Sequence, residues 1–278
     1  MRIRNILKAL ELCNWSPAIL FRMAKCAKFI PSGCNILEQA FMFRTLLSTR
    51  ASGTVLECGS YKGSTTAVLS IACKIGQRRL HVFDSFEGLP TPAENDARHR
   101  LVQGDVDHVY QAGAWAGSLD EVRCNVSRYG EISVCEFHKG FFEETLPSFQ
   151  EPTAFAFCDV DLRSSLETCL LYIWPLLVDG GVFFSHEAQH YTISELFFDS
   201  GWWNRNLHCD PPGLVGAGSG LGLIDNKAGF ADSGLGFTVK NARHLADSIE
   251  LGKAERYVVS VAGGQQSELS GNPDLPAA

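Results

Sequence analysis

The chain has 278 residues, 45% of them hydrophobic and 20% charged, a balance typical of a soluble globular protein with one large α/β domain or two small ones. Its net charge of −7 offers no basic surface for nucleic acid, and no apolar run reaches the ~20 residues that cross a bilayer. The composition therefore predicts neither a nucleic-acid partner nor a membrane-inserted protein.

Ten cysteines occur without a Cys-x-x-Cys pair or a regular spacing. Cys58, Cys135, Cys158 and Cys169 fall within apolar segments, where a free thiol packs as a small hydrophobic group. The first residues lead into a short amphipathic pattern rather than an export signal. We therefore expect a reducing, cytoplasmic location that needs neither a disulfide scaffold nor a structural zinc site.

Residues 1–48 are predicted to form a helical segment ahead of the main domain. Apolar side chains recur at helical spacing over residues 6–29, with Pro17 between two short helices, and a further helix is predicted over residues 37–47. Two roles stay open for the helices of residues 6–29: packing on the domain, or forming a lid or a dimer contact.

The stretch around which the chain is organised runs from Val55 to Ser64, with the sequence VLECGSYKGS. Val55 and Leu56 indicate the end of a buried strand, Gly59 and Gly63 permit a tight turn, and a helix is predicted over residues 65–74. A helix that begins at such a turn offers free backbone amides to a charged small molecule.

The second strand is predicted over residues 80–83 and ends on Asp84. An acidic residue at the tip of the second parallel strand is where the ribose hydroxyls of a nucleotide are held. The alternative is an ordinary turn followed by an acidic helix cap, because glycine and aspartate are common in such loops.

The polar segment of residues 91–129 separates the second strand from the third. Its first half, which contains Trp115, is predicted to be a loop over a pocket or a surface segment, and its second half a surface helix. The third strand is predicted over residues 132–137 and is followed by His138, to which we assign no role.

Two further strands end on ionisable side chains. The apolar run of residues 154–158 leads into Asp159-Val160-Asp161, and the strand of residues 182–185 leads into His186-Glu187. Because adjacent strands lie ~4.8 Å apart, Asp159, His186 and Glu187 are predicted to surround one cation. We expect Mg²⁺, although this ligand set suits it only in part, and an imidazole ligand also admits Mn²⁺, Fe²⁺ or Zn²⁺. Capping and salt bridging among strand-end side chains is the alternative.

The last third of the chain predicts a helix over residues 193–198, a glycine-rich loop over 211–220 and an antiparallel pair of strands at 221–224 and 235–240. A helix is predicted over residues 244–252 and an extra strand over 257–261. The main domain is thus expected to span residues 49–262, and residues 263–278 to form a disordered polar tail.

Five helix-separated strands with a late hairpin resemble the class I S-adenosylmethionine-dependent methyltransferases, which have a Rossmann-like, mostly parallel α/β sheet. More specifically, the chain resembles the macrocin O-methyltransferase family, which methylates hydroxyls of sugars and other natural products with the help of a divalent metal. The resemblance covers about residues 35–190. It rests on these stretches: ECGSYKGS at 57–64, FDSFEGLP at 83–90, GFFEETLP at 140–147, DVDL at 159–162 and the glycine pair at 180–181.

The resemblance implies an S-adenosylmethionine site, with Glu57 and Gly59 beside the methionine moiety and Asp84 on the ribose. The full set that it implies is Glu57, Gly59, Ser60, Tyr61, Gly63, Ser64, Asp84, Ser85, Gly140, Phe141 and Asp159. It further implies that Asp159 binds metal and that Asp161 is the general base. The family shows two consecutive aspartates where this chain has His186 and Glu187, which puts the identity of the metal, and the need for one, in question. The resemblance also implies a small-molecule hydroxyl acceptor and a homo-oligomer.

Three competing functions remain at this point. A nicotinamide-dependent oxidoreductase would use the same turn and Asp84, but Glu57 ahead of the turn and the lack of a third close glycine argue against it. A metal-dependent hydroxylase on a related fold would use His186 as an iron ligand. A non-catalytic protein would bind the cofactor and show no effect of metal.

Overall fold

A six-stranded sheet forms the centre of the computed structural model, which describes residues 16–94, 96–100, 107–216 and 234–241. Its strands follow the order β5-β2-β1-β6-β7-β8. Five of them pair in parallel, and β8 runs antiparallel to β7. In chain order they are β1 (Thr54–Cys58), β2 (Leu80–Asp84), β5 (Cys135–Lys139), β6 (Thr153–Cys158), β7 (Leu177–Ser185) and β8 (Gly236–Val239).

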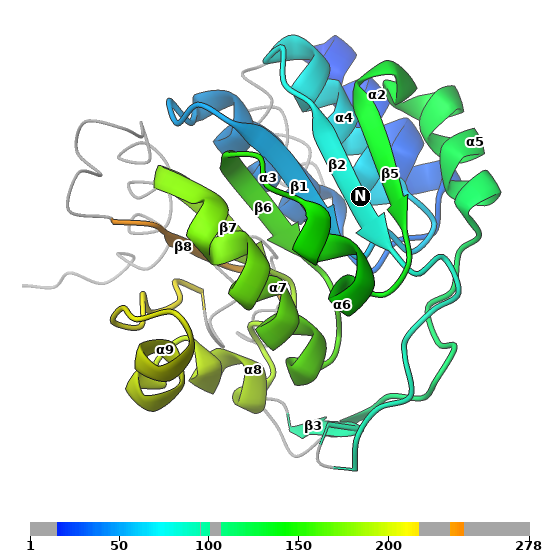
Figure 1. Cartoon of the computed structure of the whole chain (residues 1–278). Helices are drawn as coiled ribbons and strands as arrows, with labels where there is room; N and C mark the ends of the chain where they lie inside the picture. Colours follow the sequence, from blue (N-terminus) through cyan, green and yellow to red (C-terminus); the bar gives the residue numbers. More distant parts are fainter. Residues whose placement is uncertain (1–15, 95, 101–106, 217–233, 242–278) are drawn as a thin grey trace, which may run out of the picture.

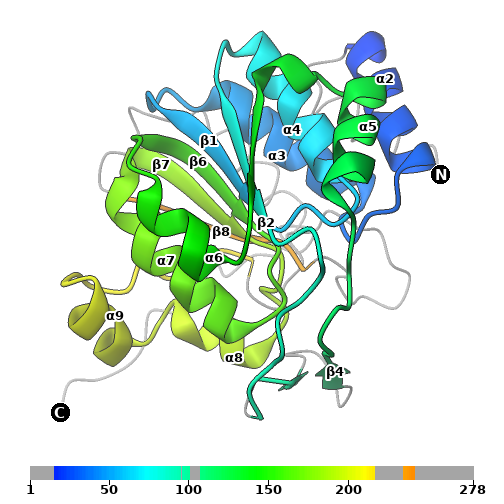
Figure 2. The ribbon, with the colours of Figure 1, turned by 45° about the vertical axis from the view of Figure 1, so that its right-hand side comes forward.

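Helices cover both faces of this sheet (Figures 1 and 2). On one face lie α2 (Pro17–Phe29), α3 (Ile36–Ser48), α4 (Ser64–Ile75) and α5 (Leu119–Tyr129). On the other face lie α6 (Phe142–Thr145), α7 (Arg163–Leu176), α8 (Tyr191–Leu196) and α9 (Ser200–Asn206). This confirms the predicted α/β class with a mostly parallel sheet.

Each face of the sheet carries its own hydrophobic core, because successive side chains of a strand point to opposite faces. Val55 of β1 packs in the core shared with α2, α3 and α4, whereas Leu56 packs in the core shared with α7 and α9. All five residues of β1 are buried. The continuous apolar runs in the sequence follow from this burial on both sides.

Two predicted strands begin elsewhere in the structure: β5 begins later than predicted, and β7 begins at Leu177 rather than at residue 182. Residues 132–134 form a 3₁₀ turn, and β5 begins only at Cys135. None of the β5 side chains is fully buried, since β5 is the edge strand. Of the predicted late hairpin, residues 235–240 contain β8, while residues 221–224 lie outside the described residues.

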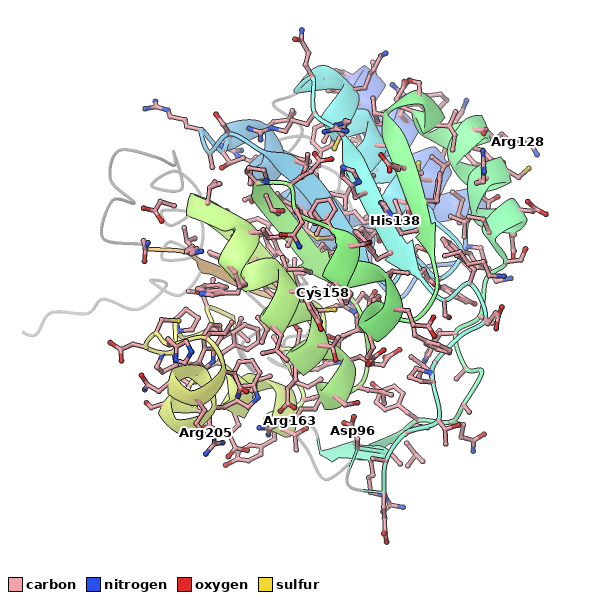
Figure 3. The ribbon with its side chains drawn as sticks, viewed as in Figure 1. Asp96, Arg128, His138, Cys158, Arg163 and Arg205 are labelled. Atoms are coloured by element: carbon pink, nitrogen blue, oxygen red, sulfur yellow. The ribbon has the colours of Figure 1, made fainter. Side chains whose placement is uncertain are left out.

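The segment of residues 91–116, predicted to be a loop over a pocket or a surface segment, includes a small antiparallel pair, β3 (Arg98–Arg100) and β4 (Asp107–Val109). It lies beyond the ends of the central strands, below α6 and α7 in Figure 1. Asp96, just before β3, accepts hydrogen bonds from the backbone amides of Arg163 (2.8 Å) and Ser164 (2.9 Å). Figure 3 shows Asp96 just before β3 and Arg163 at the start of α7. Asp96 thus caps α7, which has no side-chain cap of its own.

The N-terminal helices are part of the first core. Leu20, Met23 and Cys26 of α2 and most of the apolar side chains of α3 are buried there. The helix predicted before Pro17 lies outside the described residues, as do the predicted elements after residue 241. Among the helices that are described, none combines the length and apolarity needed to cross a membrane.

Phe184 offers a test of how the sheet holds α3. Its ring packs against Phe41 of α3, Phe155 of β6 and Phe237 of β8, with centroid distances of 5.9, 5.2 and 5.5 Å. We expect Phe184→Ala to lower the free energy of unfolding by about 3–5 kcal/mol, measured by urea denaturation. The control is Phe198→Ala, at a phenylalanine that is 58% exposed, with an expected change within about 0.5 kcal/mol. Equal losses in the two variants would contradict this account of the core.

Candidate active site

The candidate site lies where the parallel strands end, and backbone hydrogen bonds align these ends. In each case the residue just after one strand donates its backbone amide to a carbonyl at the end of the neighbouring strand. The four bonds are Gly140 to Asp84 (3.1 Å), Gly59 to Phe83 (3.0 Å), Asp159 to Cys58 (2.9 Å) and His186 to Cys158 (3.0 Å). The predicted residues at the ends of five neighbouring strands therefore stand side by side.

A cavity of about 270 Å³ opens at this edge of the sheet. The predicted site residues that line it are Gly59, Tyr61, Asp84, Ser85, Phe141, Asp159, Asp161, His186 and Glu187. The others, Glu57, Ser60, Gly63, Ser64 and Gly140, are outside its lining. The structure thus brings together the predicted base, the predicted metal ligands and the predicted ribose-binding residue around one space.

The first turn of this site requires glycine. Gly59 has a φ of +84°, and a Cβ there would lie 1.9 Å from the carbonyl oxygen of Asp159. Gly63, at φ +85°, starts α4 in the left-handed conformation. Only glycine adopts such angles readily, so the sheet can bring β1 and β6 this close only with glycine at 59.

Asp84 fastens the turn after β1 to the tip of β2. Its Oδ2 accepts hydrogen bonds from the backbone amide (2.6 Å) and the hydroxyl (3.0 Å) of Ser60, and its Oδ1 accepts one from the amide of Phe86 (2.6 Å). Burial raises the pKa of Asp84, and these hydrogen bonds oppose the rise. Ser60 therefore contributes by holding Asp84, although it does not line the cavity.

Glu57, two residues before Gly59 on β1, is a fully buried carboxyl group. Among the described residues, neither of its carboxylate oxygens has a hydrogen-bond partner. Burial raises its pKa well above the usual range, and Asp84 and Asp159 add to this rise. A buried carboxyl without a partner is costly to the fold, which marks position 57 as one that packing alone does not explain.

Asp159 and His186 face each other and meet two residues from the N-terminal segment. His186 Nδ1 lies 3.3 Å from Asp159 Oδ1, and His186 Nε2 lies 3.5 Å from Glu38 Oε2. The Cys34 thiol lies 3.9 Å from Asp159 Oδ2. Ligand atoms of Cys34, Asp159 and His186 all lie within 4.8 Å of one another, so these three could hold a metal ion.

The charges of this cluster depend on one another. Burial disfavours the charged imidazole, but contact with Cys34 and the Asp159 carboxylate outweighs it and raises the pKa of His186 well above its usual range. Burial raises the pKa of Asp159, but the neighbouring His186 imidazole outweighs burial and lowers the pKa of this carboxyl. Burial raises the pKa of Cys34 to about 12, so the thiol is protonated when no cation is bound.

Glu187 supports the turn that carries Asp161. Its Oε1 accepts hydrogen bonds from the backbone amides of Val160 (3.0 Å) and Asp161 (3.1 Å), and its Oε2 accepts one from the Ser185 hydroxyl (3.2 Å). Asp161 has a φ of +60°, a conformation that is uncommon outside glycine and that aspartate tolerates. Burial and the carboxylates of Asp159 and Asp161 raise the pKa of Glu187 well above its usual range.

Aromatic rings form much of the remaining wall. Trp115 lines the cavity and contacts Tyr61 edge to face, with 5.5 Å between ring centroids. Tyr110 belongs to the same segment as Trp115 and also lines the cavity, and its hydroxyl is 3.5 Å from His190 Nε2. Burial and then the charge of Asp161 raise the pKa of Tyr110 above its usual range. Trp202 and Trp203, by contrast, are buried in the second core.

Sequence reasoning missed Cys34, Glu38, Tyr110 and Asp96. One motif points to Glu38: Asn35 and Glu38 have the spacing of a helix capping box, and both of its hydrogen bonds are present. The pattern predicts the start of α3 but says nothing of His186, 148 positions later in the chain. No local pattern marks Cys34, Tyr110 or Asp96.

The fold and this site define a class I methyltransferase. Residues 36–195, more than half of the chain, match the macrocin O-methyltransferase (TylF) family. The chain belongs to that family, and it is an S-adenosylmethionine-dependent O-methyltransferase.

Two solved structures share the fold. The O-methyltransferase NovP has a TM-score of 0.60 at 16% identity, over 84% of this chain and 99% of NovP. The calicheamicin methyltransferase CalS11 has a TM-score of 0.51 at 16% identity, over 81% of this chain and 94% of CalS11. A comparison with the sequences of curated proteins found no match.

A pair of glycine substitutions tests the close approach of β1 and β6. Gly59→Ala places a methyl group against the Asp159 carbonyl, whereas Gly113→Ala, at φ +75°, meets nothing within 4 Å. Both variants adopt a left-handed conformation that costs roughly 1–2 kcal/mol. We expect Gly59→Ala to lower the midpoint of thermal unfolding well beyond Gly113→Ala. Similar shifts in both would mean that the turn relaxes away from Asp159.

Proposed function

We propose that this enzyme transfers the methyl group of S-adenosylmethionine to a hydroxyl of a small sugar or natural-product acceptor, with assistance from a divalent cation. The observation that carries the proposal is the cavity between Asp84 on one side and Asp159 and Asp161 on the other. One wall offers acceptors for a ribose, and the other offers the groups that deprotonate a hydroxyl.

The chemistry of the cavity fits the cofactor. Asp84 lines the space with a carboxylate held in place by Ser60 and Phe86, as ribose hydroxyls require. The rings of Tyr61, Trp115 and Phe141 provide flat apolar surface for a base. Glu57, whose buried carboxyl has no hydrogen-bond partner among the described residues, is proposed to lie beside the methionine moiety of the cofactor.

Asp161 is proposed as the general base. An alcohol has a pKa far above 7, so its proton must be taken up as the oxygen attacks the methyl carbon. Glu187 fixes the turn through the amides of Val160 and Asp161, which orients the base without touching the acceptor. With S-adenosylmethionine bound, formation of the oxygen–methyl bond would break the methyl–sulfur bond and release S-adenosylhomocysteine, and Asp161 would hold the proton of the acceptor hydroxyl.

The donor atoms around Asp159 fit a divalent cation. Asp159 and His186, two of the three predicted ligands, form a group with Cys34 whose ligand atoms all lie within 4.8 Å of one another. Glu187 instead uses its oxygens on the backbone and on Ser185. A bound cation would lower the pKa of the acceptor hydroxyl. Oxygen, imidazole nitrogen and sulfur donors favour Mn²⁺, Fe²⁺ or Zn²⁺ over Mg²⁺, which prefers six oxygens.

The acceptor class is inferred from the walls and from the family. Among the described residues, the cavity lining pairs aromatic rings with carboxylates and includes no lysine or arginine, which suits a neutral polyhydroxylated molecule. The same proposal keeps residues 1–48 as a lid or oligomer contact of the methyltransferase domain, in a cytoplasmic homo-oligomer. Cross-linking and sedimentation of the full chain test the oligomer.

A metal-dependent hydroxylase is the second candidate, favoured by one observation. Asp159 and His186 supply a carboxylate and an imidazole, the donor types of non-haem iron oxygenases. Calorimetry separates the candidates: S-adenosylhomocysteine binds to a methyltransferase, and 2-oxoglutarate with Fe²⁺ binds to a hydroxylase. Binding of NADH alone would support the oxidoreductase, and cofactor binding without turnover the non-catalytic protein.

Asp161→Asn tests the base. We expect turnover to fall by about 10²–10⁴-fold, because the amide takes no proton, while S-adenosylhomocysteine binds with unchanged affinity. Turnover is measured by release of S-adenosylhomocysteine, and affinity by calorimetry. Asp210→Asn, at an exposed aspartate, is the control and is expected to behave as the wild type. Near-normal turnover of Asp161→Asn would remove Asp161 from the mechanism.

Removal of metal tests the cation. After dialysis against a chelator we expect turnover to be lost and to return with Mn²⁺, Fe²⁺ or Zn²⁺ more fully than with Mg²⁺. Metal content, measured by mass spectrometry, is expected to fall in His186→Ala. Cys34→Ser replaces sulfur by oxygen and is expected to shift the preference toward Mg²⁺. Full activity in demonstrably metal-free protein would assign His186 an acid-base or structural role.

A further inference from the structure

A second cluster of metal-binding side chains lies on β2 and β5, outside the cavity. His81 pairs in register with Glu136, and Phe83 with His138. Because strand side chains alternate, His81, Glu136 and His138 all stand on the face of the sheet that carries α6. Figure 3 shows His138 on β5 from this side. None of the three lines the cavity.

The spacing of the donor atoms matches a tetrahedral site. His81 Nδ1 and His138 Nε2 are 3.1 Å apart, and the Glu136 carboxylate oxygens lie 3.8 Å from His81 Nδ1 and 3.9 Å from His138 Nε2. Zinc bonds of ~2.0–2.1 Å at tetrahedral angles place ligand atoms roughly 3.3 Å apart. A small movement of Glu136, which is more than half exposed, completes three ligands and leaves a fourth position for water.

The far side of His81 is also arranged as in a metal site. His81 is 1% exposed, and its Nε2 has no hydrogen-bond partner among the described residues. The nearest carboxylate, Glu151, places Oε1 3.8 Å from this nitrogen, and Arg79 holds Glu151 by an ion pair. Histidine ligands typically turn their second ring nitrogen toward such a carboxylate, which fixes the ring and strengthens the donor.

The surroundings keep both imidazoles neutral and fixed in place. Burial lowers the pKa of His81 and of His138, so both rings carry lone pairs at neutral pH. Phe83 stacks on His138 with 4.2 Å between centroids and 8° between planes, and Phe149 packs on His81. The rings are thus held before any ion binds, which lowers the entropy cost of binding.

We propose that His81, His138 and Glu136 bind a borderline divalent cation of the Zn²⁺ class, with Glu151 supporting His81. Imidazole nitrogens and one carboxylate select Zn²⁺, Co²⁺ or Ni²⁺ over Mg²⁺ and Ca²⁺. The ion would join the edge strand β5 to β2 just before the loop that presents Phe141 to the cavity. This site is independent of the proposed methyl transfer.

The experiment is a Co²⁺ and Zn²⁺ titration of the untagged, full-length, metal-free chain. Co²⁺ in a His₂Glu site gives tetrahedral d–d absorption without thiolate-to-cobalt charge transfer, which separates it from a site that includes Cys34. Binding is also expected to raise the midpoint of thermal unfolding. Both readouts are independent of turnover.

Matched variants decide the outcome. We expect His138→Asn to lose one equivalent of bound Co²⁺ with its d–d band, Glu136→Gln to bind at least tenfold more weakly, and Glu151→Gln about tenfold more weakly. His208→Asn, at an exposed histidine in the left-handed conformation that asparagine tolerates, is the control and is expected to match the wild type. If Glu136→Gln and His138→Asn give the wild-type titration, the pair is a plain histidine–histidine hydrogen bond and the proposal is wrong.

Discussion

The hydrogen-bond ladder of the parallel sheet continues one residue beyond the strands, and the site depends on that continuation. The amides of Gly59, Asp159 and His186 each reach the last carbonyls of the neighbouring strand. Backbone hydrogen bonds, rather than contacts between side chains, therefore set the distance between the residues that follow β6 and β7. A glycine at 59 is the condition for this approach, because the Asp159 carbonyl occupies the place of its Cβ.

Several carboxyl groups lie buried at the ends of these strands, and hydrogen bonds from the backbone offset the free-energy cost of burying them only in part. Asp84 and Glu187 are both buried and both accept backbone amides, from Ser60 and Phe86 in one case and from Val160 and Asp161 in the other. Burial still raises the pKa of each, so it is costly to keep these carboxyl groups charged here. A site that retains such cost is organised for a ligand with positive charge or donor hydroxyls rather than for stability.

The sequence alone predicted the sheet, the strand tips and the side chains on them, because apolar runs and terminal glycines or acids are local features. It placed β5 three residues early, since Ile132 and Val134 have strand propensity but form a 3₁₀ turn at the sheet edge. It could not pair Cys34 with Asp159, or Asp96 with the start of α7, because those contacts join distant segments. The sequence also could not predict the hydrogen-bond partners of Glu187. Its position in the chain brings the carboxylate to the end of β7, but the packing of the fold decides that it accepts the amides of Val160 and Asp161.

The capping box of α3 shows how a local motif acquires a role in the site. Glu38 Oε2 accepts the Asn35 backbone amide at 2.8 Å, and the same oxygen lies 3.5 Å from His186 Nε2. The helix start therefore fixes the carboxylate that faces one ring nitrogen, while Asp159 faces the other. An imidazole held from both sides keeps its orientation without further contacts. The position of His186 thus depends on α3, so the N-terminal segment belongs to the site as much as the strand tips do.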